Sequence, residues 1–178
     1  NIPSVVVGIV QEGQLAHVIS RGEKKRESGI PVDAATGYQI ASLSKSFTAI
    51  IVNSLAAEGQ LDLNKSVAHY LKGDIPEAAL EKFKSMTLVH VLQHRAGLPN
   101  QGASIPPTPN GTAMLGGYTQ EGFIKDLTEM EIDPERLGKF GYSNLGFGLL
   151  GHIAEKFGFS LNDPIDKIPK EAMNAFAA

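Results

Sequence analysis

A serine and a lysine three residues apart stand at the start of an apolar segment and could do chemistry together. They are Ser42 and Lys45, in the stretch IASLSKSFTAI. Residues three apart lie on the same face of a helix, so these two side chains are expected to face together, whereas Ser44 and Ser46 point elsewhere. A serine hydroxyl is a poor nucleophile unless a neighbouring group takes its proton, and a lysine in a water-poor cleft can take or relay it. Ser42 is therefore a candidate nucleophile.

The position of Ser42 at a helix start is consistent with either a catalytic role or a structural one. Backbone N–H groups and the positive end of the helix dipole favour negative charge developing at that point, as an acyl-transfer reaction requires. A serine at a helix start is, however, more often a simple cap. Ser42 and Lys45 form the only Ser-x-x-Lys pair in the chain, but such a pair readily arises by chance in a sequence of this length.

A tyrosine and an asparagine two residues apart form a second candidate. Tyr142 and Asn144 stand in FGYSNLG, a loop just before an expected helix. In an extended or turn backbone this spacing sends both side chains to the same side. Tyr142 could act as acid or base if nearby cations lower its pKa from about 10, and Asn144 could bind a substrate amide or the lysine. A loop tyrosine with a purely structural role is the alternative.

Other motifs are weaker. His90 and His94 lie four apart on an expected helix and could ligate a metal, but the HExxH pattern is absent. The glycines of GFGLLG do not follow a strand as a phosphate-binding loop requires. We therefore expect no metal, cofactor or nucleotide. Single histidines are more often packed or solvated, and three aromatic or aliphatic residues near Tyr142 are expected in the core. The histidines are His17, His69 and His152, and the apolar residues are Phe140, Leu145 and Phe147.

The elements that must position these residues begin with a β-hairpin. Residues 4–10 and 15–20 are rich in β-branched side chains and flank a glycine-containing turn. After a polar connection, apolar residues recur at helical spacing up to Gly59, a natural helix stop. The members of this pattern are Leu43, Phe47, Ile50, Ile51 and Leu55. Since its remaining faces are small or apolar, this helix is expected to be buried on most sides.

Helices and loops follow the hairpin and the first helix. A helix is expected from the cap Thr87 to Gly97, and two more over residues 119–130 and 144–158. The Pro- and Gly-rich segment of residues 98–118 is expected to be either a functional loop or a mobile one. An isolated hairpin has two open edges and is marginal alone, so it needs further strands or a partner.

Composition restricts the class of protein. The 178 residues are 42% hydrophobic and 20% charged with a net charge of −3, which is typical of an ordinary globular protein and not of a nucleic-acid binder. The short basic run EKKRE is expected to be a solvated face. The longest apolar runs fall short of the ~20 residues that a membrane span needs. Cysteine is absent, so disulfides are excluded, and no signal peptide is visible.

Four segments together resemble one known family. IASLSKSFTA, EGQLDLNKSVAHYL, MTLVHVLQHRAGLP and FGYSNLGFGLLGHIAEKFG occur in the order and approximate spacing of the serine β-lactamase and penicillin-binding-protein family. The sequence is most similar to the branch of class C β-lactamases, D-alanyl-D-alanine carboxypeptidases and family VIII-type esterases. The resemblance covers about residues 3–158. It implies an α+β, β-lactamase/transpeptidase-like fold, an antiparallel sheet flanked by helices with a mainly helical subdomain.

The resemblance also implies a mechanism. Ser42 would attack a carbonyl to form an acyl-enzyme and would give one oxyanion donor from its backbone N–H. Lys45 and Tyr142 would share general acid and base work, and Asn144 would bind the substrate. No metal or cofactor is implied. The substrate would be a small-molecule or peptide amide or ester, and a periplasmic or secreted location is favoured.

The sequence departs from the family in its third motif. Neither Lys-Thr-Gly nor His-x-Gly occurs, and we expect the C-terminal strands of the sheet and the N-terminal helix to be missing. We expect one partial domain, with the hairpin and its connection in residues 1–40, a helical region in 41–158 and a weakly defined tail in 159–178. The chain is then a fragment, or needs a second chain or missing C-terminal segment to complete the sheet, or is a catalytically silent binding or structural protein. Feeble activity at best is expected of these residues alone.

Overall fold

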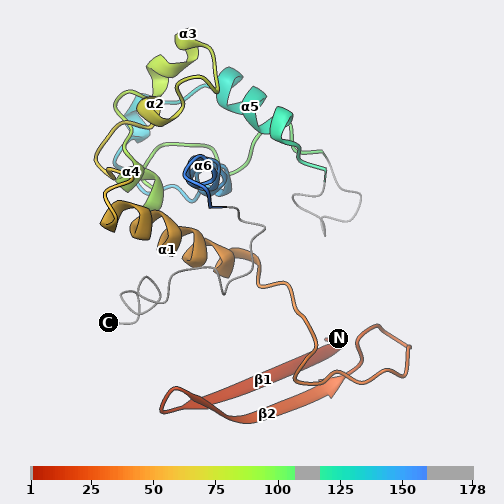
Figure 1. Ribbon diagram of the computed structural model, residues 1–178. Helices are drawn as coiled ribbons and strands as arrows, with labels where there is room; N and C mark the ends of the chain where they lie inside the picture. The colour runs from red at the N-terminus through yellow and green to blue at the C-terminus, as the bar shows by residue number, and fades with distance from the viewer. Residues whose placement is uncertain (1, 107–116, 160–178) are drawn as a thin grey trace. The chain divides into compact units, whose positions relative to one another are not determined.

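The computed structural model describes residues 2–106 and 117–159, and within it the chain forms two compact units, Asn1–Ala41 and Ser42–Ala178 (Figure 1). The expected tail falls almost entirely on residues 160–178, outside the described part, as do residues 107–116 of the expected long loop. Among the described residues, no helix combines the length and the hydrophobicity that crossing a bilayer requires.

The first unit is built on the expected antiparallel hairpin. Strand β1 covers Ser4–Gln11 and β2 covers Gln14–Gly22, so each strand is slightly longer than predicted. The two-residue turn, Glu12 and Gly13, has φ angles of 51° and 76°, the left-handed geometry that matches the twist of a hairpin. The register shifts between Ile9 and Val10, which marks a bulge.

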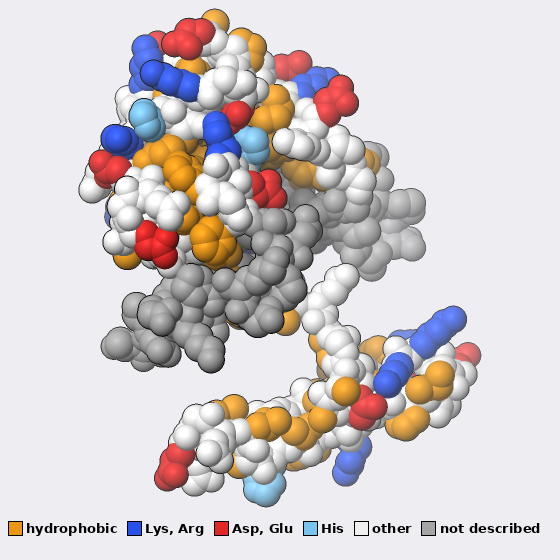
Figure 2. All heavy atoms as spheres, in the orientation of Figure 1, with side chains coloured by type: hydrophobic (Ala, Val, Ile, Leu, Met, Phe, Trp, Pro, Cys, Tyr) orange, Lys and Arg blue, Asp and Glu red, His pale blue; other side chains and the backbone are white. Residues whose placement is uncertain are grey.

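The hairpin exposes much of its apolar surface. Hydrophobic side chains lie along it in Figure 2, and several of them are more than two-fifths exposed. These are Val5, Val7, Ile9, Val10, Leu15 and Ile19. In the described part of the chain the sheet consists of these two strands. A two-stranded ribbon is marginal in water. The exposed apolar side chains of β1 and β2 are of the kind that a larger sheet buries against other elements.

The second unit has a core centred on two apolar helices. Helix α1 covers Ser44–Ala57 and α6 covers Asn144–Glu155, and the two are in contact. Val52 and Leu55 of α1 are fully buried, as is most of α6, which confirms that the first helix is buried on most sides. Leu43 is an exception to the predicted pattern, because it lies in a 3₁₀ turn before α1 and is 66% exposed.

Shorter helices complete the core. The cap Thr87 begins α4 (Leu88–Leu92) as predicted, but this helix ends at Leu92 and not at Gly97. The helix ends early because His94 adopts a left-handed conformation with φ of 56°. The other elements are α2 (Val67–Tyr70), α3 (Glu77–Leu80), α4 (Leu88–Leu92), α5 (Gln120–Glu129) and the 3₁₀ turns η1 (Ala41–Leu43), η2 (Glu81–Phe83) and η3 (Pro134–Arg136).

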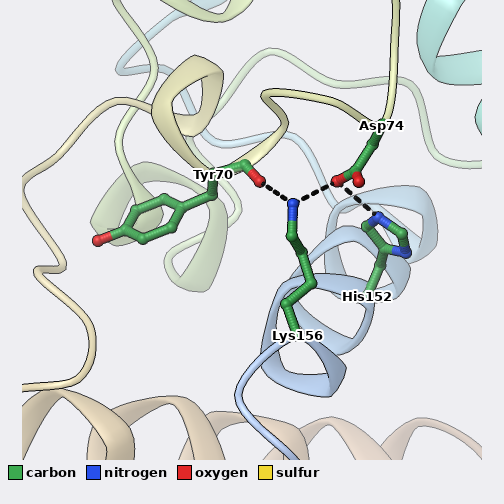
Figure 3. Close-up of polar contacts among 4 residues, drawn as sticks. All are labelled: Tyr70, Asp74, His152 and Lys156. Atoms are coloured by element: carbon green, nitrogen blue, oxygen red, sulfur yellow. Dashed lines mark hydrogen bonds and ion pairs between the residues drawn. The ribbon is translucent and has the colours of Figure 1, made fainter.

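A polar cluster joins the C-terminal half of α6 to the turn after α2. Lys156 donates hydrogen bonds to the carbonyl of Tyr70 at 2.7 Å and to Asp74 at 2.8 Å, and His152 Nε2 lies 3.0 Å from the same carboxylate (Figure 3). Partial burial opposes ionisation of Asp74, but the hydrogen bonds from Lys156 and His152 outweigh it. They hold the pKa of this carboxyl below its ordinary value of 3.8.

We expect Asp74→Asn to destabilise the protein at pH 7 by about 1–2 kcal/mol, because it leaves Lys156 and His152 without their carboxylate. The pKa of Asp74 is lower in the folded state than in the unfolded state. Its contribution is therefore present above about pH 4 and is lost as the pH falls through the lowered value. Urea unfolding at pH 7 and near pH 3 measures both effects.

Glu81→Gln is the matched control, since Glu81 and Lys84 form an exposed ion pair whose removal is expected to change stability by less than about 0.5 kcal/mol. Equal urea midpoints for Asp74→Asn and the unaltered protein at pH 7 would show that the cluster contributes nothing.

Candidate active site

The structure brings all four predicted side chains together in the second unit. Tyr142 Oη donates a hydrogen bond to Ser42 Oγ at 2.7 Å, although the residues are 100 positions apart. Lys45 Nζ lies 3.4 Å from Ser42 Oγ and 2.6 Å from Asn144 Oδ1. The predicted facing of Ser42 with Lys45, and of Tyr142 with Asn144, therefore agrees with the geometry.

Ser42 stands on a constrained backbone. It is the middle residue of η1 (Ala41–Leu43), directly before α1, and it is exposed. The preceding residue, Ala41, has φ of 47°, a left-handed conformation that costs a residue with a Cβ about 1 kcal/mol or more. The strained residue thus lies directly before the candidate nucleophile, and backbone strain of this kind clusters at functional sites.

The loop carrying Tyr142 is fixed by its neighbour Ser143. Ser143 is 4% exposed, and its hydroxyl accepts a hydrogen bond from Gly146 N at 2.8 Å while donating to the carbonyl of Pro99 at 2.6 Å. It is therefore the N-cap of α6. A Cβ on Gly146 would lie 3.2 Å from Val91 and 3.3 Å from Ser143 Oγ, so glycine allows α4 and α6 to approach closely here.

Asn100 orients Asn144 and was not identified from the sequence. Asn144 Nδ2 donates to Asn100 Oδ1 at 3.0 Å, while Asn144 Oδ1 faces Lys45. The carbonyl of Asn100 also accepts the backbone N–H groups of Asn144 and Leu145. These bonds define both the amide orientation of Asn144 and the start of α6. Asn100 has no motif spacing to Asn144, so no signal in the sequence could have found it.

The segment that carries Asn100 is anchored to α5. Asp126 is 5% exposed and accepts hydrogen bonds from Ser104 N at 2.9 Å, Ser104 Oγ at 2.7 Å and Tyr118 Oη at 2.6 Å. Burial and the Asp126 carboxylate together raise the pKa of Tyr118, which therefore stays a hydrogen-bond donor at neutral pH. In residues 98–106 the expected loop is thus held in place by the core.

Lys45 dominates the electrostatics of the site. Within residues 2–106 and 117–159 no carboxylate pairs with it, and its ammonium lies 4.8 Å from the ring centroid of Tyr142 and 5.8 Å from that of Phe147. This ammonium, and then the hydrogen bond with Ser42, lower the pKa of Tyr142 against a small opposing effect of burial. The site therefore stabilises the phenolate form of Tyr142 relative to a tyrosine side chain in water.

The histidines and apolar residues near the site have defined places. Nδ1 of His90 accepts the backbone N–H of Thr87 at the start of α4, whereas Nδ1 of His94 accepts that of Ser143. Among the described residues no group of three or more His, Cys, Asp or Glu side chains is arranged to hold a metal ion. Leu145 and Phe147 are buried as predicted. The prediction for Phe140 is wrong, since it is 74% exposed in the loop before α6.

The sequence comparisons place the chain in a family. The sequence model of the Beta-lactamase family matches residues 1–167. A β-lactamase from Providencia stuartii is 33% identical over 97% of this chain and 40% of its own length. An N-acetylmuramyl-L-alanine amidase from Bacillus subtilis (strain 168) is 29% identical over 86% of this chain and 37% of its own. The chain belongs to the β-lactamase family.

Solved structures confirm the fold. A class C β-lactamase from Rhodobacter sphaeroides superimposes with a TM-score of 0.68 at 26% identity, covering 97% of this chain and 49% of that one. An octameric penicillin-binding protein homologue from Pyrococcus abyssi gives 0.69 at 28% identity, covering 93% and 38%. The predicted β-lactamase/transpeptidase-like fold is therefore correct. The chain spans about 40% of the length of these sequence relatives, and at most about half of these solved chains.

Ser143→Ala is expected to lower the free energy of unfolding by about 1–2 kcal/mol, because it removes the N-cap of α6 and the bond to Pro99 together. Chemical denaturation checks this value. Ser54→Ala on α1 is the control, since within the described part of the chain the Ser54 hydroxyl makes no hydrogen bond, and it is expected to change stability by less than about 0.5 kcal/mol. An equal loss in both variants would contradict the capping role.

Proposed function

We propose that this chain carries the nucleophile and the proton-transfer groups of a serine hydrolase that acts on an amide or ester through an acyl-serine intermediate. The observation that carries the proposal is the contact of Ser42 Oγ with both Tyr142 Oη and Lys45 Nζ. A serine within hydrogen-bond reach of two proton-transfer groups has the arrangement of an activated nucleophile.

In the proposed reaction, Ser42 Oγ attacks the substrate carbonyl carbon and its proton passes to the pair formed by Tyr142 and Lys45. The tetrahedral intermediate collapses, the bond to the leaving amine or alcohol breaks, and the same pair returns the proton to that group. Water then attacks the acyl-serine by the reverse sequence and releases the acid. The lowered pKa of Tyr142 supports its role as acceptor, and we assign the initial base to the pair jointly.

Asn144 is the proposed substrate-binding residue. Its carbonyl oxygen faces Lys45 and its amide nitrogen faces Asn100, so the amide is held in one orientation beside the serine. A fixed amide of this kind can hydrogen-bond an amide group of a bound substrate. The named relatives, β-lactamases and an amidase, favour an amide bond as the target. The choice among β-lactams, D-alanyl peptides, amides and esters depends on pocket loops.

We also propose that further strands, from the same protein or from a second chain, complete the sheet and the oxyanion hole. The exposed apolar faces of β1 and β2 support this proposal. The chain also matches only 40% of the length of the Providencia stuartii β-lactamase. Ser42 would supply one backbone donor, and the third motif of the family would supply the second. Loss of one oxyanion donor typically costs 10²–10³ in rate, so residues 1–178 alone are expected to be slow. A periplasmic or secreted location is proposed from the family.

The second candidate is a catalytically silent binding or structural protein of the same fold. In this candidate the contacts of Ser42 with Lys45 and Tyr142 only support the fold. The two candidates differ in whether Ser42 can be acylated at all.

Covalent labelling with a fluorescent penicillin or a fluorophosphonate tests the proposal. We expect one label per chain, detected by intact mass, and its complete loss in Ser42→Ala. Ser46→Ala is the matched control, because Ser46 is an exposed serine of the same stretch and is expected to label normally. Because residues 1–178 alone are expected to react slowly, labelling is followed until it no longer increases. A folded sample that is still unlabelled by both probes at that point would rule out the hydrolase and favour the silent candidate.

Tyr142→Phe is expected to slow labelling about 10²-fold while leaving stability nearly unchanged, because it removes only the hydroxyl that bonds Ser42. The alkaline part of the rate profile is also expected to shift, since the pKa of Tyr142 lies below 10 in the native protein. Stopped-flow labelling between pH 6 and 10 measures both. An unchanged rate and profile would remove Tyr142 from the mechanism.

A further inference from the structure

His94 occupies a backbone position that normally belongs to glycine. At the end of α4 (Leu88–Leu92), His94 N bonds to Val91 O at 3.0 Å and Arg95 N bonds to His90 O at 2.7 Å, the two bonds of a Schellman motif. His94 is the left-handed residue of this motif, with φ of 56°. A residue other than glycine in this conformation costs stability, and such residues cluster at functional sites.

The contacts of His94 converge on three consecutive residues. Its carbonyl oxygen accepts Gly141 N at 2.7 Å, and its ring Nδ1 accepts Ser143 N at 3.1 Å. Between them, the ring of Tyr142 lies 4.5 Å from the imidazole centroid at 35°. His94 therefore contacts the residue before Tyr142, the residue after it and the Tyr142 ring itself.

This geometry requires one protonation state. Nδ1 can accept the Ser143 N–H only if it carries no proton, so the neutral ring has its proton on Nε2. Lys45 of α1 and Tyr142 of the loop are the titratable groups that face the ring, while α6 presents the uncharged Phe147 at 4.9 Å. Within the described residues no carboxylate pairs with His94.

We infer that neutral His94 is a positioning residue that holds Tyr142 against Ser42, and that protonation of Nδ1 releases the Tyr142 loop. The inference rests on the proposed function for its effect on acylation, but not for the contacts themselves. A proton on Nδ1 would face the Ser143 N–H and remove its acceptor. It would also place a second positive charge near Lys45 in a half-buried setting.

The electrostatics support this inference. Burial, and then the charge of Lys45, lower the pKa of His94 below its ordinary value of 6.5. Because the folded state prefers the neutral ring, the arrangement is intact at neutral pH. Its contribution to stability declines as the pH falls below 6.5 through the lowered value. The site is thus expected to weaken as the pH falls through this lowered value.

The first test reads the ring directly and needs no catalysis. Nitrogen-15 NMR of the uniformly labelled chain at pH 7.5 is expected to show His94 with an unprotonated Nδ1 and a protonated Nε2, and titration is expected to give a pKa below 6.5. A proton on Nδ1, or a charged ring at pH 7.5, would overturn the inference. If His94 titrates as expected but Ser42 is not acylated by the penicillin or fluorophosphonate probe, only the proposed hydrolase is refuted.

The second test compares two substitutions. Asn tolerates a positive φ and offers Oδ1 near the place of Nδ1, so His94→Asn keeps an acceptor that does not titrate, whereas His94→Ala removes it. In His94→Ala we expect the pKa of Tyr142 to rise towards about 10 and labelling to slow about 10- to 100-fold. In His94→Asn we expect most of this loss to be recovered and the decline below pH 6.5 to disappear.

His69→Asn is the control, since His69 is an exposed histidine of the same unit that contacts Tyr70 and not the site. It is expected to leave the titration of Tyr142 and the acid decline unchanged. If His94→Ala fails to fold, His94→Asn and the control still decide the matter through the pH profile. A Tyr142 that titrates in folded His94→Ala as it does in the unaltered protein, or an acid decline that persists in His94→Asn, would overturn the inference.

Discussion

The packing of α1 against α6 is the contact on which the rest of the site depends. Val52 and Leu55 of one helix and Leu149 and Ile153 of the other are fully buried. A buried leucine contributes about 2 kcal/mol, whereas a net hydrogen bond contributes about 1 kcal/mol. The core therefore fixes the distance between the first turns of the two helices, and the polar contacts above it follow from that distance.

The parts of the site that obey a local spacing could be predicted from the sequence. Ser42 and Lys45 face together because helical geometry relates residues three apart, and Tyr142 and Asn144 face together because an extended loop relates residues two apart. Helix α1 was evident from its apolar period, and the hairpin from β-branched runs around a glycine turn. What joined the two pairs was the family resemblance, since no local rule relates residues 100 positions apart.

The parts that depend on tertiary contacts could not be predicted. The backbone carbonyl of Asn100 accepts N–H groups at the start of α6, and its side-chain oxygen accepts Asn144 Nδ2. The residues around Asn100 in the sequence give no indication of these contacts. Helical spacing predicts that His90 and His94 could ligate one metal ion, but α4 ends before His94, and the His94 ring instead accepts the backbone N–H of Ser143. Phe140 was placed in the core by its hydrophobicity alone, yet its loop leaves it exposed.

Gly146 shows how far the site extends beyond the residues that react. It lies in the interface of α4 and α6, where even a methyl group would press on Val91 and on the Ser143 hydroxyl. Val91 precedes His94 by one turn, and Ser143 follows Tyr142, so a larger residue would move both supports of the tyrosine. A survey that sorts relatives as active or inactive by their serine, lysine, tyrosine and asparagine alone would score such a variant as intact. In this chain the missing side chain of Gly146 is therefore as much a part of the site as the four side chains that carry the chemistry.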